Sequence, residues 1–289
     1  MTYADLWHSL TPLYDAREAQ SIVRYVLSER FALSLTDIAG GAAEQLADDK
    51  LRPLMERLQE GEPVQYVLGR AMFCGRTFCV SPAVLIPRPE TETLCQWVSE
   101  EYRGTLTTQP PRLLDVGTGS GCIAVTLALE CQGAEVAALD ISADALAVAR
   151  DNARRLGAQV RFLEADILAD ADRLCEEGTL GEHTLSAIVS NPPYICQKER
   201  ALMHANVLGH EPHTALFVPD DDPLLFYRAI ARAGRRLLRQ GGHLFFEINP
   251  IYSDALAAML SDEGYADTAS RPDPFGKTRC MKTTLNTHE

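Results

Sequence analysis

The sequence has no long apolar run and no excess of basic residues. No apolar segment among its 289 residues approaches the length that spans a bilayer, and Met1–Asp5 contain neither a basic nor an apolar stretch that could begin an export signal. The formal net charge is −13, so broad electrostatic binding to a nucleic acid backbone is not expected. These absences predict a cytoplasmic protein that binds neither membranes nor nucleic acid directly.

The eight cysteines lack the spacing of a metal site. They include no Cys-x-x-Cys pair, and no cluster of histidines lies near them. We therefore expect reduced, mostly buried thiols and no bound metal. Hydrophobic residues make up 46% of the chain, and it has no internal repeat or low-complexity tract. This composition indicates a globular protein with one large domain and a small appendage.

Three parts of the chain differ in pattern. Apolar residues at helical spacing predict a small N-terminal helical domain, either a packing module or a docking surface for a macromolecular partner. Val64, Tyr66 and Leu68 then alternate, and a second extended segment surrounds Gly75, which together predict a β-hairpin linker. The remainder is the main domain. The predicted division is residues 1–62, 63–84 and 85–289.

From residue 112 onward, strand-like apolar runs alternate with helical patterns. The predicted strands cover residues 112–116, 135–139, 160–163, 185–189 and 243–248, and the predicted helices 122–130, 142–156, 223–239 and 252–263. A polar linker precedes them at 104–111, and an acidic, loop-like excursion lies at 169–184. This alternation predicts an α/β fold with a Rossmann-like, doubly wound and mostly parallel sheet.

The first predicted strand ends in a glycine-rich turn. Small residues between a strand and a helix let a ligand approach the backbone closely. The spacing Asp-x-Gly-x-Gly-x-Gly differs from the dinucleotide pattern Gly-x-Gly-x-x-Gly, which disfavours NAD as the main alternative ligand. It resembles the S-adenosylmethionine loop of class I methyltransferases. The candidate cofactor-binding residues of this turn are Asp115, Gly117, Thr118, Gly119, Ser120 and Gly121.

Acidic residues also follow the next two predicted strands. Asp140 has the right place to accept hydrogen bonds from both ribose hydroxyls of the cofactor, and Asp166 from the adenine amino group. Ile167 is expected to pack on the adenine ring. Acidic positions at three successive strand ends strengthen the prediction of an S-adenosylmethionine site, because ligands of doubly wound sheets lie beyond the carboxyl ends of the strands.

The fourth predicted strand delivers the segment Asn191-Pro192-Pro193-Tyr194. Two prolines cannot extend a sheet ladder, so the backbone must leave the sheet here in a fixed shape. The corner would present an amide and an aromatic face to the cleft. The alternative interpretation is a stiff turn whose asparagine caps its own backbone and whose tyrosine packs on the core.

Together, the glycine loop and this corner resemble amino-methyltransferases, and more specifically the HemK/PrmC family of release factor glutamine methyltransferases. Further family positions match over nearly the whole chain: Pro63–Gly69, Phe73, Ile86–Glu92, Glu211-Pro212 with Ala215-Leu216, and Phe275–Lys277. His210 before Glu-Pro, Val64 and the longer segment at 170–184 depart from the family pattern. The resemblance implies a class I methyltransferase fold with S-adenosylmethionine as cofactor.

The resemblance also implies the reaction. The family methylates the side-chain nitrogen of the glutamine in a Gly-Gly-Gln tripeptide of class 1 peptide release factors, and the helical N-terminal domain helps to hold that partner. The glycine loop, Asp140 and Asn191 would bind the cofactor, while Asn191–Tyr194 would hold the glutamine. A monomer is expected.

The corner offers a geometry that suits methylation of an amide nitrogen. Asn191 and the main-chain carbonyl of Pro192 can accept the two hydrogens of the substrate amide, which would orient a poorly nucleophilic nitrogen and stabilise the developing positive charge. Tyr194, with Phe73 opposite, would sandwich the planar amide. Arg88, held between two prolines, suits an orienting role toward the substrate. No strong general base is required, so His213 is expected to have no role in proton transfer.

Two other functions fit part of the sequence. A nucleic acid methyltransferase acting on an exocyclic amino group uses the same kind of polar-Pro-Pro-aromatic corner on a flipped base, although the acidic charge argues against it. A non-catalytic module that only binds the cofactor is the second alternative. It would have no need of amide acceptors directed at a methyl donor.

Overall fold

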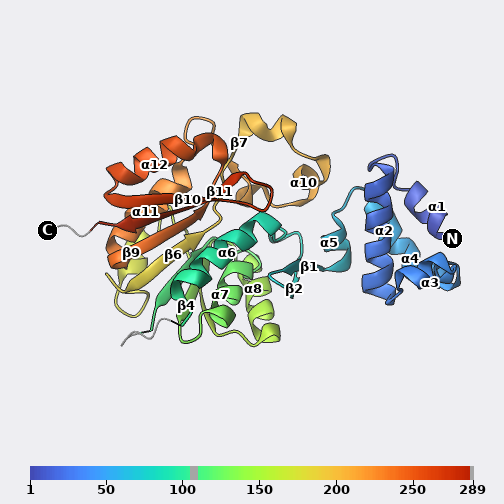
Figure 1. The fold of residues 1–289 in the computed structure, drawn as a ribbon, viewed down its shortest axis with the longest axis horizontal. Coiled ribbons are helices and arrows are strands. Elements are labelled where there is room, and N and C mark those ends of the chain that lie inside the picture. Colours follow the sequence, from blue (N-terminus) through green and yellow to red (C-terminus); the bar gives the residue numbers. More distant parts are fainter. Residues whose placement is uncertain (105–109, 287–289) are drawn as a thin grey trace. The chain divides into compact units, whose positions relative to one another are not determined.

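The computed structural model describes residues 1–104 and 110–286, and most of the predicted linker at 104–111 therefore lies outside the described residues (Figure 1). The chain forms two compact units. The first consists of Met1–Arg70, Val80–Pro82 and Met203–Glu211, and the second of Ala71–Cys79, Ala83–Leu202 and Pro212–Glu289.

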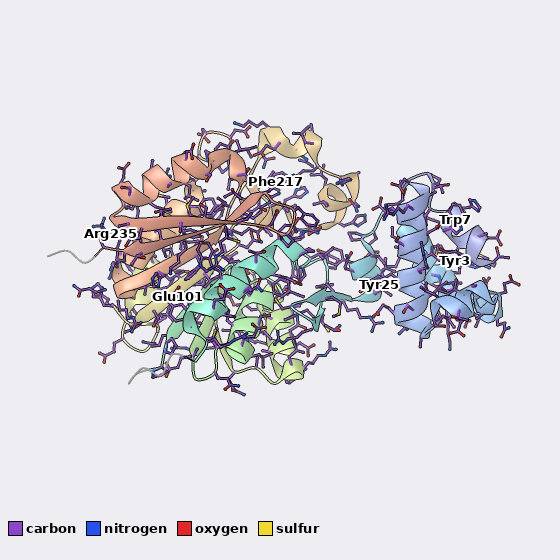
Figure 2. The ribbon with its side chains drawn as sticks, in the orientation of Figure 1. Tyr3, Trp7, Tyr25, Glu101, Phe217 and Arg235 are labelled. Carbon is purple, nitrogen blue, oxygen red and sulfur yellow. The ribbon has the colours of Figure 1, made fainter. Side chains whose placement is uncertain are left out.

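The first unit is helical. Its elements are α1 (Tyr3–His8), α2 (Ala16–Phe31), α3 (Leu35–Ala39), η1 (Ala42–Gln45), α4 (Asp48–Gln59), α5 (Val64–Leu68) and α10 (Ala205–His210). Side-chain caps from Thr2, Asp15 and Ser34 begin α1, α2 and α3, as expected where a helix leaves backbone N–H groups unpaired. The Tyr3 hydroxyl donates to the Gln20 carbonyl and joins α1 to α2. Figure 2 shows Tyr3 and Trp7 among the side chains of this unit.

The prediction that Val64, Tyr66 and Leu68 lie in a strand is wrong, because they form the short helix α5. Val67 is buried in the apolar core of the first unit, with Val64 and Leu68 packed against it, so one helical face explains the pattern better than alternation. The helix ends at Gly69, whose φ of +69° suits glycine. The extended segments follow it as a two-stranded sheet of β1 (Arg70–Phe73) and β2 (Arg76–Cys79).

The second unit confirms the predicted α/β fold. Among the described residues its central sheet has the strand order β10-β11-β9-β6-β3-β4-β5. The strands are β3 (Arg112–Val116), β4 (Glu135–Asp140), β5 (Val160–Glu164), β6 (Leu185–Ser190), β9 (Leu238–Glu247), β10 (Tyr265–Pro272) and β11 (Thr278–Leu285). Neighbours from β9 through β6, β3 and β4 to β5 pair in parallel. Only β11 against β9 and β10 against β11 are antiparallel pairs of this sheet.

Helices cover both faces of this sheet (Figure 1). They are α6 (Pro89–Tyr102), α7 (Cys122–Glu130), α8 (Ala143–Leu156), α9 (Ala171–Cys175), α11 (Leu225–Leu237) and α12 (Ser253–Asp262). Side chains alternate between the faces along each strand. Leu113 therefore lies in the core cluster with residues of α6, α7 and α8, whereas Leu114 lies in the cluster with residues of α9, α11 and α12.

Two segments differ from the sequence prediction by more than a residue or two at their ends. The helix expected to reach residue 239 ends at Leu237, and β9 begins at once with Leu238 and continues through Gly241. Pairing with β6 shifts between Leu185–Leu238 and Ala187–His243, so the glycines form an irregularity within a strand instead of stopping a helix. The acidic excursion at 169–184 contains the helix α9, which buries Leu174 and Cys175.

Substitution of a glycine in the turn between β3 and α7 is expected to destabilise the protein. Gly121 has φ +80°, and a Cβ there would lie 3.0 Å from the Ala149 Cβ. Gly133 has a similar φ of +85° with nothing within 4 Å. We expect Gly133→Ala to lower the free energy of unfolding by about 1 kcal/mol and Gly121→Ala by roughly 2–4 kcal/mol. Urea unfolding of the two variants separates the clash from the backbone strain, and equal losses would contradict the packing argument.

Candidate active site

Five parallel strands end at one edge of the sheet and bring the candidate residues together. Val116 pairs with Leu139 and with Ser190, Asp140 pairs with Glu164, and Ser190 pairs with Phe246. The glycine loop, Asp140, Asp166 and the Asn-Pro-Pro-Tyr corner all follow these ends directly. Polar candidate residues therefore cluster at the carboxyl ends of the strands, which is where doubly wound sheets bind their ligands.

The glycine loop curls over the end of β4. The N–H groups of Gly117 and Thr118 both donate to the Leu139 carbonyl, at 2.9 and 3.0 Å. Gly117 and Gly119 have positive φ of +73° and +53° and nothing within 4 Å of the position of a Cβ. A ligand can therefore approach the backbone here without meeting side chains.

Asp115 lies beneath this loop and supports it. The side chain is fully buried, and its Oδ2 accepts hydrogen bonds from the Thr118 hydroxyl at 2.6 Å and the Ala124 N–H at 3.2 Å. Thr118 and Ser120 are also buried. The Thr118 hydroxyl is engaged by Asp115, so these buried side chains help to shape the turn.

Asp140 joins the loop to the next helix. Its Oδ2 accepts from the Gly119 N–H at 2.8 Å and its Oδ1 from the Ser142 N–H at 2.9 Å. Each carboxylate oxygen keeps a further lone pair for a ligand hydroxyl. The following side chain, Ile141, is 62% exposed, an apolar surface at this edge that the sequence reasoning did not single out.

Asp166 and Ile167 lie farther along the same edge. Asp166 is half-buried, and its Oδ1 accepts from the Leu168 N–H at 2.8 Å. Ile167 is buried in the core cluster, whereas Leu168 is 45% exposed. The exposed apolar side chains beside the acidic residues are therefore Ile141 and Leu168, and Ile167 contributes mainly to the core.

The Asn-Pro-Pro-Tyr corner leaves β6 through a fixed anchor. The Ser190 hydroxyl donates to the Val116 carbonyl at 2.7 Å, which ties the end of β6 to the end of β3. Pro192 is buried and Pro193 half-buried. The chain then enters β7 (Ile195–Cys196), which pairs with β8 (Phe217–Val218). Both sides of the corner are therefore held by strands.

Inside the corner, two residues that the sequence reasoning missed connect Asn191 to Tyr194. The Asn191 side-chain amide donates to the Thr91 hydroxyl at 3.2 Å, and Thr91 donates to Glu247 Oε2 at 2.5 Å. The Tyr194 hydroxyl donates to Glu247 Oε1 at 3.0 Å, and Asn249 donates to the Tyr194 carbonyl at 3.3 Å. A signal was present: Glu247, like Asp115 and Asp140, is an acid at the end of an apolar strand.

Burial dominates the protonation behaviour of the corner. It raises the pKa of Glu247, against the hydrogen bonds from Thr91 and Tyr194 and the nearby charge of Arg279. Burial and the adjacent Glu247 raise the pKa of Tyr194 well above its ordinary value, with Arg279 and Arg88 opposing the shift. Tyr194 is therefore a neutral phenol at physiological pH and cannot act as a general base.

Comparison with known proteins places this geometry in a family. A family model described as methyltransferase small domain matches residues 99–216. Release factor glutamine methyltransferase of Bacteroides thetaiotaomicron is 44% identical over 276 residues, which cover 94% of this chain and 95% of that protein. The protein of the same name from Flavobacterium psychrophilum is 37% identical, over 95% of this chain and 94% of its own. The chain belongs to the release factor glutamine methyltransferase family. The resemblance seen in the sequence is confirmed.

A solved structure agrees with the methyltransferase fold. The methyltransferase from Pyrococcus furiosus has a TM-score of 0.51 and 15% identity, over 84% of this chain and 100% of that one. At this identity the likeness concerns the fold alone.

The prediction that Phe73 lies opposite Tyr194 is wrong. Phe73 does not face Tyr194, because it is fully buried and packs edge-to-face on Phe78 with ring centroids 6.0 Å apart. Phe73 belongs to the core cluster under α6, α7 and α8, whereas Tyr194 packs against the cluster on the other face of the sheet. Phe73 therefore supports the fold and is not available to sandwich a substrate amide.

Arg88 is the remaining polar candidate, and His213 is the histidine expected to have no role in proton transfer. Arg88 is half-buried and immediately precedes α6, with Pro89 as the first helical residue, a position that proline favours. Its charge opposes the raised pKa of Tyr194, so it lies near the corner. The His213 imidazole packs edge-to-face on the Phe217 ring, with the ring centroids 5.5 Å apart.

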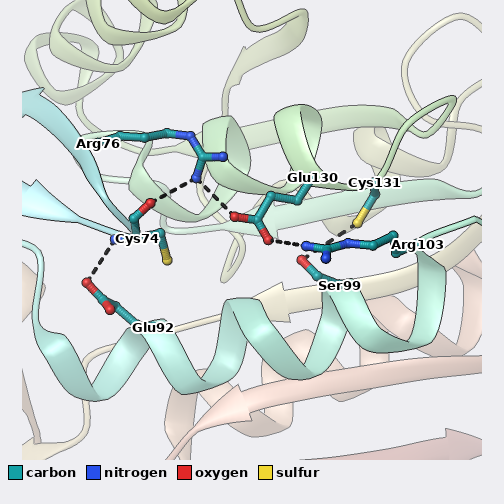
Figure 3. A network of polar contacts seen from close by, with 7 residues as sticks. All are labelled: Cys74, Arg76, Glu92, Ser99, Arg103, Glu130 and Cys131. Atoms are coloured by element: carbon teal, nitrogen blue, oxygen red, sulfur yellow. Dashed lines mark hydrogen bonds and ion pairs between the residues drawn. The ribbon is translucent and has the colours of Figure 1, made fainter.

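A separate polar network fixes the β1–β2 turn against α6 and α7 (Figure 3). The Cys74 N–H donates to Glu92 at 2.8 Å, and Arg76 and Arg103 both bind Glu130, at 3.0 and 2.9 Å. A hollow of about 580 Å³ lies beside these residues. Its charged side chains are already engaged: Arg103 binds Glu130, Glu92 accepts from Cys74, and Glu100 binds Arg271. None of the candidate site residues lines it.

Within residues 1–104 and 110–286, no group of three or more His, Cys, Asp or Glu side chains is arranged to hold a metal ion. Nor does the described part of the chain contain a helix of sufficient length and apolar character to cross a membrane.

Asp115 makes the stability of this family member depend on pH. Burial raises its pKa from 3.8 to about 7, with a further contribution from Asp140, against the hydrogen bonds from Thr118 and Ala124. Because the folded state holds this proton more tightly than the unfolded state, the stabilisation is complete below about pH 4 and is lost as pH rises toward 7. We expect the melting temperature of Asp115→Asn to fall less between pH 5 and 7.5 than that of the unmodified protein. Parallel curves in calorimetry would contradict this.

Proposed function

We propose that this protein transfers a methyl group from S-adenosylmethionine to the side-chain amide nitrogen of the glutamine in the Gly-Gly-Gln motif of class 1 peptide release factors. The observation that carries the proposal is the hydrogen-bonded corner from Asn191 to Tyr194, next to an open glycine loop. Relatives that carry the release factor glutamine methyltransferase name align over nearly their whole length, which supports the same substrate class.

The residues at the sheet edge fit the cofactor. The exposed backbone of Gly117 and Gly119 leaves room for the close approach of a ligand, and Asp140 retains acceptor capacity for ribose hydroxyls. Asp166 would accept from the adenine amino group, and Ile141 and Leu168 offer apolar surface for the ring. Bound S-adenosylmethionine would supply an electrophilic methyl group, whose bond to the sulfonium sulfur breaks on transfer and leaves S-adenosylhomocysteine as the product.

The corner residues bind and orient the substrate amide. An amide nitrogen is a weak nucleophile, because its lone pair is delocalised into the carbonyl. Asn191 Oδ1 and the Pro192 carbonyl accept its two hydrogens, fix its direction and stabilise the positive charge that develops on it. The Tyr194 ring packs on the planar amide, and Arg88 orients the peptide around it. The proton leaves to solvent after transfer, so a strong base is not needed.

The helical part of the chain is proposed to hold the partner. Residues 1–62 form the docking domain, 63–84 the linker and 85–289 the catalytic domain. The role of the helical domain is distinct from electrostatic attraction to RNA, because the whole chain carries a formal charge of −13. The protein is proposed to act as a monomer in the cytoplasm.

A methyl-transfer assay with labelled S-adenosylmethionine tests the proposal. The substrates are a class 1 release factor, the same factor with the Gly-Gly-Gln glutamine changed to alanine, and bulk DNA and RNA. We expect label on the unmodified factor alone. Label on nucleic acid would instead favour a base methyltransferase with the same corner. Binding of the cofactor without transfer to any of these substrates would overturn the proposed reaction.

A further inference from the structure

We propose that Thr91 and Glu247 are positioning residues that fix which end of the Asn191 side-chain amide faces the substrate. The inference rests on the proposed function, because it assigns a direction to the hydrogen bond that Asn191 makes with the reacting glutamine. It also predicts how the site distinguishes glutamine from glutamate.

The direction follows from counting donors and acceptors. Both oxygens of Glu247 accept hydrogen bonds in the structure, from the hydroxyls of Thr91 and Tyr194, and a hydroxyl has a single hydrogen to donate. Thr91 donates that hydrogen to Glu247 Oε2 at 2.5 Å. The Thr91 oxygen can then only accept, and its remaining partner, 3.2 Å away, must be the NH₂ group of Asn191. Asn191 Oδ1 is consequently left to accept from another group.

The chain of hydrogen bonds from Asn191 through Thr91 to Glu247, called the relay below, is fixed at both ends. Thr91 and Glu247 are each 2% exposed, so water does not compete for their hydrogen bonds. Glu247 ends β9, between β6 and β11, and pairs with Cys280. Its second oxygen accepts from Tyr194 at 3.0 Å, and Asn249 binds the Tyr194 carbonyl. One buried carboxylate thus orients both the amide and the aromatic residue of the corner.

The orientation has a consequence for selectivity. An oxygen directed at the substrate accepts from the NH₂ group of glutamine but repels the carboxylate of glutamate, which has the same shape. If the Asn191 amide turned over, its NH₂ group would instead donate to a carboxylate. A site that must pair with an NH₂ group strongly rejects an analogue without one. Thr91 and Glu247 therefore contribute to selectivity without contacting the substrate.

Substitution of Thr91 tests the inference. Thr91→Val keeps the shape and removes the hydroxyl, whereas Thr91→Ser keeps the hydroxyl. We expect kcat of Thr91→Val to fall roughly tenfold or more, with the affinity for S-adenosylmethionine unchanged, and Thr91→Ser to retain most activity. Calorimetry with the release factor and with the factor whose glutamine is replaced by glutamate gives the selectivity. In Thr91→Val the preference for glutamine should fall by a similar factor.

Glu247→Gln is the second variant. Its amide can donate to Thr91, which permits the reversed chain of hydrogen bonds, so we expect the same loss of preference even if Thr91→Val folds poorly. A merely structural role would lower stability without changing the preference between glutamine and glutamate. Unchanged kcat and preference in both variants would overturn the inference. If the unmodified protein does not methylate the factor at all, the proposed function has failed, and the inference fails with it.

Discussion

Replacing Asn191 with alanine is expected to lower kcat by about 10²–10³-fold while leaving most of the affinity for S-adenosylmethionine intact. The change removes an acceptor that acts on charge developing in the transition state, and the loss of one such preorganised group typically has this size. The Asn191 amide is anchored to Thr91 and not to the glycine loop, so the cofactor site should persist. Steady-state kinetics and calorimetry measure the two quantities.

A matched control for this variant is Gln132→Ala. Gln132 carries the same side-chain amide, is exposed, and follows α7 at the opposite edge of the sheet, so kcat should not change. If Asn191→Ala bound no cofactor at all, the assignment of Asn191 mainly to the substrate would be wrong. A kcat within a few-fold of the unmodified protein would remove Asn191 from catalysis.

Replacing Asp140 with alanine should have the opposite signature and raise the dissociation constant for S-adenosylmethionine by about 10- to 100-fold. A hydrogen bond to a charged group contributes about 1.5–3 kcal/mol, and this carboxylate is expected to accept from the ribose. The variant also releases the N–H groups of Gly119 and Ser142, which loosens the loop. At saturating cofactor, kcat should be largely retained.

Asp144→Ala provides the comparison. Asp144 lies in the first turn of α8 and is exposed, so its loss removes a similar negative charge near the loop without removing a ligand contact. Calorimetry should give an almost unchanged dissociation constant for this variant. An unchanged value for Asp140→Ala as well would rule out the ribose assignment.

Local patterns predicted most of the second unit. The predicted helix 122–130 matches α7, and the predicted strand 135–139 matches β4, which extends one residue farther to Asp140. Short, continuous apolar segments between glycine and polar boundaries leave few alternatives, and parallel topology then places their ends at one edge. The errors lie in short segments. Val64–Leu68 fits alternation and helical spacing equally well, and only packing against the first unit's core decides for the helix.

The parts of the site that escaped prediction depend on long-range packing. Thr91 lies in the matched segment Ile86–Glu92 and Glu247 at the end of an apolar strand, but neither position indicates its partner. Their contact exists because α6 packs beside the end of β9. Phe73 was misassigned for the same reason. An aromatic residue in a short strand can face a cleft or the core, and here the neighbouring Phe78 and α6 bury it. Spacing in sequence cannot decide such cases.

The hydrogen bond between Thr91 and Glu247 joins residues 156 positions apart. A nascent chain still attached to a ribosome therefore completes its glycine loop long before it completes the catalytic corner. Until β9 has left the exit tunnel, Asn191 has no relay to hold its amide. The order of synthesis therefore separates the two parts of the site: the glycine loop is made first, and the fixed orientation of the Asn191 amide follows only once Glu247 has been made.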